Sequence, residues 1–106
     1  MKDDFRPNSP AQSGVERIAI ERDRQIYEEG HTEEGDVGRA NELAKAGLAY
    51  AEFAAAQVKG YVIDNPTANW PWDNEAWKPD LEEPVPNLVK AGALIAAAID
   101  ALGSDL

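Results

Sequence analysis

The most conspicuous chemical groups in this sequence are three indole rings that lie close together. Trp70, Trp72 and Trp77 are the only tryptophans of the chain, and Lys78 follows the last of them. Indole rings stack on bases and other planar groups, and cationic side chains pair with phosphates. This stretch is therefore a candidate binding site. The alternative is that the three rings mainly cover the core.

A second set of polar residues lies in segment 15–31. Arg22 falls at helical spacing between Ile18 and Ile26, so its charge must either pair with a carboxylate inside the fold or reach a ligand. The candidate ligand- or partner-binding residues of the whole chain are Arg22, Arg24, Gln25, Glu29, His31, Trp70, Trp72, Trp77, Lys78 and Lys90.

The composition excludes several catalytic and metal-binding chemistries. The chain has no cysteine and one histidine, so it offers no thiolate nucleophile, no disulfide, no cysteine-ligated zinc and no multi-histidine metal site. Glu33, Glu34 and Asp36 lack the alternating oxygen-ligand pattern of a calcium loop. A solvated loop with Asp36 as a helix N-cap is the favoured interpretation. We predict no catalytic residue, no metal ligand and no cofactor.

The formal net charge of −10 argues against direct binding of nucleic acid, which needs clustered Lys and Arg. It fits a soluble acidic protein, or a surface that competes for a basic groove on another protein, as nucleic-acid mimics do. The N-terminus shows no signal-peptide pattern, and we expect no membrane span. The predicted location is the cytoplasm.

The helix signals predict an all-α fold. Residues 1–12 read as a flexible arm, and residues 13–106 as a single helical domain. Ser13 and Glu16 have capping-box spacing, and Gly30 is the natural stop of the first helix. Its apolar stripe is expected to contain Val15, Ile18, Ala19 and Ile26.

A second helix is expected over about 39–58, with Gly47 marking a close helix–helix contact and Gly60 as its stop. Its apolar stripe contains Leu43, Gly47, Tyr50, Ala54 and Val58. The third helix should run from Asn87 as N-cap to Gly103. Its expected stripe is Leu88, Ala91, Ile95, Ile99 and Leu102.

Five prolines between residues 64 and 86 exclude a long helix there. Asp73 could cap a single turn that ends at Trp77, and we expect Trp77 to pack inward. The predicted architecture is a small bundle of three main helices with a Trp/Pro-rich connection packed on it.

Four blocks of the sequence resemble a family of small, uncharacterised proteins of tailed phages and prophages. They are residues 21–30, 70–73, 77–79 and 87–97. The resemblance implies a phage accessory protein and specifies no reaction. The chain departs from the family pattern at His31, where the family usually has Trp, and at residues 81–86, where the family has a basic cluster.

The three helices are also similar to the MazG-type nucleotide pyrophosphohydrolases. Those enzymes hold Mg²⁺ with paired E-x-x-E and E-x-x-D carboxylates, whereas here the partners of Glu42 and Glu52 at this spacing are Lys45 and Ala55. A partial similarity to ryanodine-receptor repeat domains, at Glu21–Arg22 and Gly30–Thr32, keeps a small-molecule pocket under consideration.

Three functional hypotheses follow. The first is a non-enzymatic phage accessory protein in the host cytoplasm that binds a host protein or complex, most plausibly an anti-CRISPR-like counter-defence inhibitor. The second is a nucleotide-binding or sequestering protein, or a degenerate pyrophosphohydrolase. The third is a homo-oligomer whose Ala-rich helices pack against copies of the chain.

Overall fold

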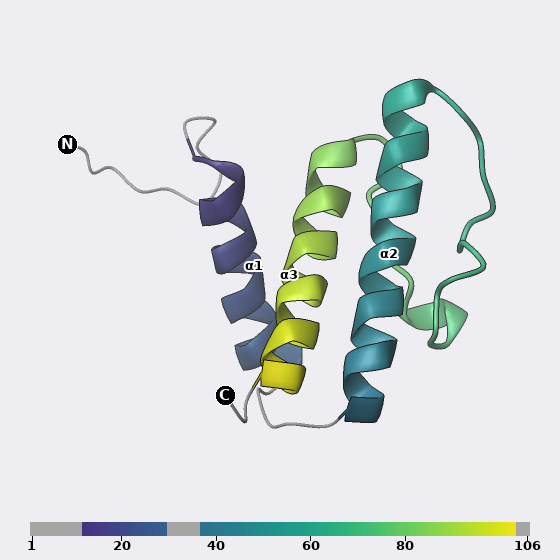
Figure 1. The fold of residues 1–106 in the computed structure, drawn as a ribbon. Coiled ribbons are helices and arrows are strands. Elements are labelled where there is room, and N and C mark those ends of the chain that lie inside the picture. Colours follow the sequence, from purple (N-terminus) through teal and green to yellow (C-terminus); the bar gives the residue numbers. More distant parts are fainter. Residues whose placement is uncertain (1–11, 30–36, 104–106) are drawn as a thin grey trace.

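The computed structural model describes residues 12–29 and 37–103. Its helices are α1 (Gly14–Glu29), α2 (Val37–Lys59), the short 3-10 helix η1 (Asn74–Ala76) and α3 (Pro84–Gly103). Figure 1 shows α3 between α1 and α2, and α2 running antiparallel to α3. Helices α1 and α2 both pack on α3. The predicted all-α bundle of three main helices is confirmed.

The start of α1 is the predicted capping box. The backbone N–H of Ser13 donates to Glu16 Oε1 at 2.7 Å, and that of Glu16 donates to Ser13 Oγ at 3.1 Å. These two bonds satisfy N–H groups that a helix start leaves without partners. The predicted apolar stripe is only partly correct, because Val15 and Ala19 are exposed whereas Ile18 lies against Gly92 of α3.

Helices α2 and α3 approach each other closely at Gly47. A Cβ atom there would lie 2.8 Å from Ile95 Cγ1 and 3.1 Å from the carbonyl oxygen of Ala91, so any larger residue would separate the helices. The predicted role of Gly47 is confirmed. Gly60 follows the helix with φ of +82°, a conformation that favours glycine. The expectation that Val58 is buried is wrong, since it is exposed.

The predicted N-cap of α3 is wrong. The helix begins at Pro84, and Asn87 lies inside it, fully buried. Its Nδ2 donates to Gln57 Oε1 at 2.8 Å and to the carbonyl oxygen of Asp80 at 2.9 Å, while its Oδ1 accepts from the Asp80 N–H at 2.8 Å. The Asp80 carboxylate instead accepts the N–H groups of Glu82 and Glu83 just before the helix. Asn87 therefore joins α2, α3 and the connection.

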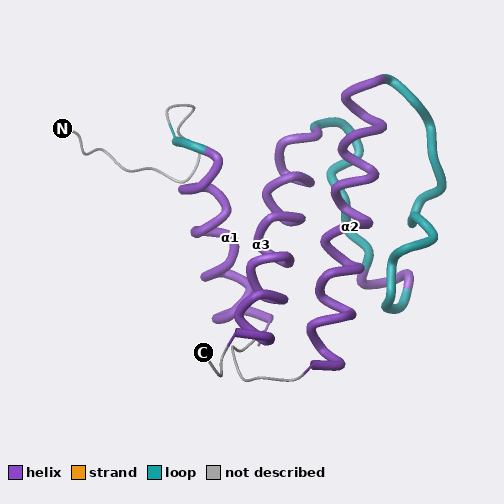
Figure 2. The backbone as a smooth tube through the Cα atoms, viewed as in Figure 1, coloured by secondary structure: helices purple, strands orange, loops and turns teal. Residues whose placement is uncertain are grey.

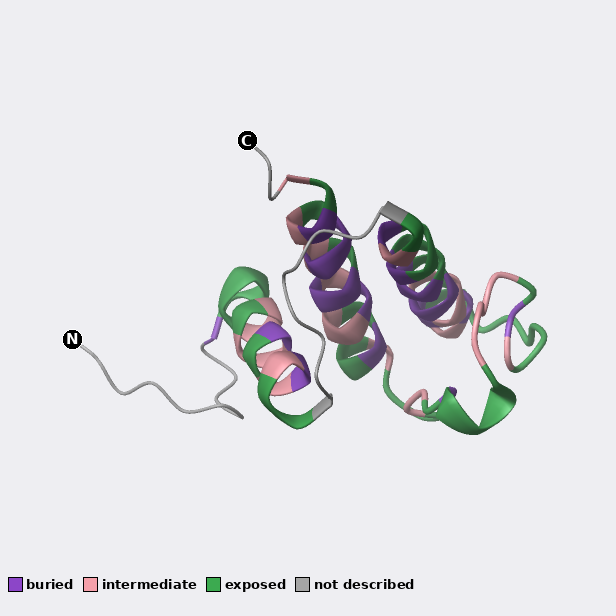
Figure 3. Ribbon diagram, turned by 90° about the horizontal axis from the view of Figure 1, so that it is seen from below, coloured by how far each residue is buried: buried purple, intermediate pink, exposed green. Residues whose placement is uncertain are grey.

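The predicted buried stripe of α3 is also wrong. Ala91 is buried, but the other four members of the stripe are exposed by 44% or more: Leu88, Ile95, Ile99 and Leu102. The residues that face the protein are mostly small, namely Asn87, Ala91, Ala93, Leu94, Ala97, Ala98 and Ala101. Figure 3 shows the buried residues concentrated along α2 and α3, whereas most of α1 is intermediate or exposed. A thin alanine layer separates α2 from α3, and larger side chains remain outside it.

The connection from α2 to α3 packs on the helices without forming a strand in its described residues (Figure 2). Tyr61, Val62 and Ile63 are exposed and not helical, and the Asn65–Pro66 peptide bond is cis. The single turn before Trp77 is confirmed as η1, but the Asp73 side chain makes no cap hydrogen bond.

One helix bears on the expectation that the chain has no membrane span, which stays a prediction. Within the described residues, α3 is long and apolar enough to cross a membrane by length and composition, although we expected no such segment. Part of this helix is buried against the protein. The same test is passed by core helices of soluble proteins.

Candidate functional site

A cleft in the described part of the chain lies where α1, α2, α3 and the connection come together. Its volume is about 260 Å³. The side chains around it are polar, cationic and aromatic: Glu21, Arg24, Gln25, Tyr50, Trp70, Trp72, Ala76, Lys78, Lys90 and Leu94. Six candidates from the sequence therefore lie together here: Arg24, Gln25, Trp70, Trp72, Lys78 and Lys90.

Three aromatic rings form one wall of the cleft. Trp70 packs edge-on against Trp72, with ring centroids 5.3 Å apart, and against Tyr50, at 5.5 Å. The Trp70 indole N–H donates to the carbonyl oxygen of Asp73 at 2.9 Å, and that of Trp72 donates to Glu42 Oε1 at 3.1 Å. Both rings are half-buried. Their indole N–H groups are therefore satisfied while part of each ring remains accessible to a ligand.

Trp77 supports this wall from behind. It is buried, stacks on Tyr50 with centroids 4.6 Å apart, and packs edge-on against Phe53 at 5.8 Å. Its indole N–H donates to Asn65 Oδ1. The prediction that Trp77 packs inward is confirmed, and its ring does not line the cleft.

The opposite wall is built by a polar turn of α1. Arg24 Nη2 and Nε donate to the two carboxylate oxygens of Glu21 at 2.7 and 2.9 Å, and Gln25 Nε2 donates to Glu21 Oε2 at 3.2 Å. Helical i,i+3 and i,i+4 spacing produces this arrangement. Gln25 is buried, and its Oε1 has no hydrogen-bond partner among the described residues. A buried carbonyl oxygen without a protein partner is stabilised by a donor, which an ordered water or an N–H group of a ligand can supply.

Two lysines complete the cleft. Lys90 Nζ lies 5.3 Å from the Tyr50 ring centroid and donates to the carbonyl oxygen of Lys78 at 2.6 Å. The Lys78 N–H donates to the Tyr50 hydroxyl at 3.1 Å. The lining thus carries three cationic side chains and one carboxylate, Glu21, in a chain of net charge −10. This local excess of positive charge favours an anionic ligand.

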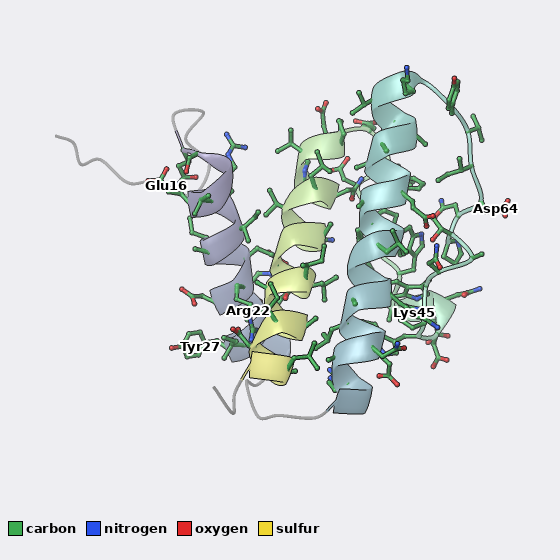
Figure 4. All side chains as sticks on the ribbon, viewed as in Figure 1. Glu16, Arg22, Tyr27, Lys45 and Asp64 are labelled. Carbon is green, nitrogen blue, oxygen red and sulfur yellow. The ribbon has the colours of Figure 1, made fainter. Side chains whose placement is uncertain are left out.

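Arg22 lies outside the cleft lining. Its Nη2 and Nε donate to Asp100 Oδ2 at 3.0 and 3.3 Å, and Figure 4 shows the side chain directed from α1 toward α3. Of the two interpretations from the sequence, the arginine–carboxylate pair is confirmed. The side chain of Glu29 and the whole of His31 lie outside the described residues, as do residues 1–11 of the expected arm over 1–12 and the Asp36 cap. Gln12, the last residue of that arm, is buried, so the arm does not extend to it.

The sequence did not nominate Glu21 and Tyr50 as site residues. Glu21 precedes Arg24 and Gln25 by three and four residues, a spacing that was available to identify it. Tyr50 was assigned to the core stripe of α2, where it does lie. Its hydroxyl and the edge of its ring reach the cleft only because the connection folds back over α2, and no local pattern predicts that path.

The described residues contain no group of three or more His, Asp or Glu side chains that could hold a metal ion. The pKa of one carboxyl group is shifted: the N–H groups of Glu83 and Glu82 hold the pKa of Asp80 below its ordinary value, with a smaller contribution from Lys90. Asp80 is not among the cleft residues. It organises the start of α3.

Comparison with protein-family models, with curated proteins and with solved structures finds no match to this chain. The resemblances to phage proteins, to MazG-type enzymes and to ryanodine-receptor repeats thus stay predictions from the sequence.

Proposed function

We propose that this protein binds a small anion that carries a planar ring, with a nucleotide as the chemical class that fits best. The observation that carries the proposal is the cleft itself, where Arg24, Lys78 and Lys90 meet the rings of Trp70 and Trp72 in an otherwise acidic chain. Aromatic side chains stack on a base whatever its identity, and cationic side chains pair with phosphate.

The two walls of the cleft would contact different parts of the nucleotide. A base that stacks on the exposed part of one of the two rings, Trp70 or Trp72, which stand at 86° to each other, would offer its exocyclic N–H to Gln25 Oε1, which has no described partner. The phosphates would then face Lys78 and Lys90. Because a cleft of about 260 Å³ is small for a drug-sized ligand, a mononucleotide would extend partly into solvent.

Glu21 limits which anion can enter. Its carboxylate is half-buried in the lining and neutralises Arg24 through two hydrogen bonds. A phosphate that displaced it would break a bidentate ion pair, so the phosphate is expected near the lysines. Adenine, cytosine and guanine, which carry an exocyclic amino group, match Gln25 better than uracil does.

Tryptophan fluorescence tests this proposal. The wild type is titrated with ATP, GTP, CTP, UTP, adenosine and inorganic phosphate, with and without Mg²⁺. We expect saturable quenching by ATP, weaker effects of adenosine and phosphate, and roughly a tenfold loss of affinity in Lys90→Gln, which corresponds to about 1.4 kcal/mol. Lys59→Gln removes an exposed positive charge from the end of α2 and should bind like the wild type.

Absence of quenching across the panel would refute the nucleotide proposal. Equal losses in Lys90→Gln and Lys59→Gln would show that only net charge matters. Release of pyrophosphate or phosphate in the presence of Mg²⁺ would instead indicate an enzyme of the MazG type, against the interpretation of the carboxylate pattern.

The charge of −10 favours a second proposal: a phage accessory protein that blocks a basic groove on a host protein complex, as anti-CRISPR inhibitors do. This proposal is tested by phage infection of hosts with an active defence system, with and without expression of the protein, and by affinity capture with a purified defence complex. Protection of the phage together with salt-sensitive capture would support it. Neither effect would be seen if the nucleotide cleft is the only function.

A further inference from the structure

The side of the α2–α3 pair that faces away from the connection is apolar and exposed. Two contacts define the sides: Tyr50 meets Lys90 on the side of the cleft, and Gly47 meets Ile95 toward the other side. We name this second side the open face. Its residues are Ala44, Leu48, Ala51, Ala55 and Val58 of α2, and Leu88, Gly92, Ile95, Ile99 and Leu102 of α3. Eight of the ten are exposed; Ala51 and Gly92 are half-buried, and Ile18 of α1 lies against Gly92 at the edge of the face.

The spacing on the open face follows the same rule on both helices. The positions are 44, 48, 51, 55 and 58 on α2, and 88, 92, 95, 99 and 102 on α3, so steps of four and three residues alternate. That alternation is the heptad pattern of helices that pack against other helices at a small angle. Each helix already uses a different stripe for its partner within the chain, since Leu43, Tyr50 and Ala54 are buried on α2 and Ala91, Leu94 and Ala98 on α3.

The exposed area is too large to be incidental. Five large aliphatic side chains are exposed by 44–62%: Leu48, Leu88, Ile95, Ile99 and Leu102. Together they present on the order of 450 Å², within the range at which patches on monomers mark interaction sites. A stable interface takes roughly 800 Å² from each partner, so the small residues of the open face and its rim must be buried together with these five side chains.

The distribution of charge limits where a second copy can dock. The ten positions of the open face are uncharged, whereas the acidic groups of α2 and α3 that have described partners face other elements: Glu42 accepts from Trp72, Glu52 from Asn69, and Asp100 from Arg22. Two chains of net charge −10 repel each other over most of their surface, so the uncharged face is where two copies can meet.

We propose that the open face is a homodimer interface. A twofold axis that lies in the interface, parallel to the helix layer and perpendicular to the helix axes, places the heptad stripes of one protomer on the same stripes of its partner and closes a four-helix bundle. Such an interface is self-complementary, so one apolar face satisfies both partners. Leu88, Ile95, Ile99 and Leu102 then form the inner layer of the bundle, which explains why alanines lie within the protomer and larger side chains outside it.

Light scattering coupled to gel filtration, across a hundredfold dilution series, tests the proposal. The wild type should elute at twice the chain mass of 11.5 kDa, and Ile99→Glu should elute as a folded monomer, with helicity checked by circular dichroism. Val62→Glu adds the same charge at a residue that is 98% exposed in the connection, and it should stay dimeric. A monomeric wild type at all concentrations, or a dimeric Ile99→Glu, would overturn the proposal.

A cross-linking measurement covers the case in which Ile99→Glu fails to fold. Since the chain has no cysteine, Ile95→Cys introduces a single thiol near the middle of the interface, close to its copy across the twofold axis. A short bismaleimide should couple two such protomers through thioether bonds and should leave Val62→Cys uncoupled. Equal coupling of the two variants would contradict the proposal, and so would flotation of the wild type with neutral lipid vesicles as a monomer.

Discussion

On the cleft side of α3, Asn87 and Lys90 hold the connection through hydrogen bonds to Asp80 and Lys78, and aromatic rings pack above Leu94. On the open face of the same helix, Ile99 and Leu102 lie largely in solvent. One helix thus supports a polar, aromatic covering on one side and leaves an apolar surface on the other. Hydrophobicity alone does not decide which side of a helix faces the protein; hydrogen-bonding groups at fixed positions can decide it.

The first test removes Trp77, the central ring of the aromatic covering on the cleft side of α3. Trp77→Ala should reduce the free energy of unfolding by about 3–5 kcal/mol, because it leaves a cavity among Tyr50, Phe53 and Trp70. Trp72→Ala should cost about 1–2 kcal/mol, since that ring is half-buried at the cleft edge. Urea unfolding followed by circular dichroism measures both. If the two variants lost the same free energy of unfolding, Trp77 would not be a core ring distinct from the cleft ring Trp72.

The second test removes the polar centre of the cleft side. Asn87→Ala should cost about 2–4 kcal/mol, because the N–H of Asp80 and Gln57 Oε1 lose the amide that satisfies them in a buried place. A double-mutant cycle with Gln57→Ala should give a combined loss smaller than the sum of the single losses. Additive losses would mean that the two amides act independently.

The third test concerns the close approach of α2 and α3. In Gly47→Ala the new methyl group would meet both Ile95 and the backbone oxygen of Ala91. We expect a net loss of about 1 kcal/mol, after the gain in helix propensity is subtracted from the cost of overpacking. In Gly92→Ala the new methyl group would lie 2.4 and 2.8 Å from Ile18 Cδ1 and Cγ1. Because a β-branched side chain has few rotamers in a helix, α1 must shift, and we expect a loss of about 1 kcal/mol here as well. A neutral Gly92→Ala in thermal unfolding would show that α1 packs more loosely on α3 than α2 does.

The smallest expected effect is the pH dependence of the stability that Asp80 contributes. The pKa of Asp80 is lowered in the folded state from 3.8, so its hydrogen bonds to Glu83 and Glu82 add stability above the unfolded-state pKa. This stability is lost as the pH falls through the lower, folded-state pKa. Asp80→Asn should unfold more easily than the wild type at neutral pH, and the difference should shrink below pH 3.8. A difference that does not change with pH would assign the effect to the side-chain shape.

The sequence predicted the local features of this fold well. The capping box at Ser13, the stop at Gly60 and the contact at Gly47 each depend on a few neighbouring residues and on steric rules. The faces of α3 could not be predicted in the same way, because its apolar residues surround most of the helix. The face of α3 that is buried depends on Asn87, whose hydrogen-bond partners are Gln57 and Asp80. Gln57 lies in α2 and Asp80 in the connection, so neither belongs to α3.

In the candidate site too, the sequence predicted what depends on residue type but not what depends on contacts between distant residues. Arg24, Gln25, Trp70, Trp72, Lys78 and Lys90 were selected by residue type, and all six line the cleft. Arg22 was selected by the same reasoning but pairs with Asp100, which lies 78 residues away in the sequence. A charged residue on an apolar face needs a partner, and the sequence does not show whether that partner is a ligand or a distant side chain.

The most direct test of the proposed cleft is a ¹⁵N-correlated NMR spectrum of the wild type, recorded while ATP is added. Three indole N–H signals are expected, one for each tryptophan. We predict that the signals of Trp70 and Trp72 shift with one common affinity, that the Trp77 signal shifts less, and that the backbone N–H signals of Ile99 and Leu102 stay in place. Unchanged indole signals at millimolar ATP, or shifts confined to the open face, would contradict it.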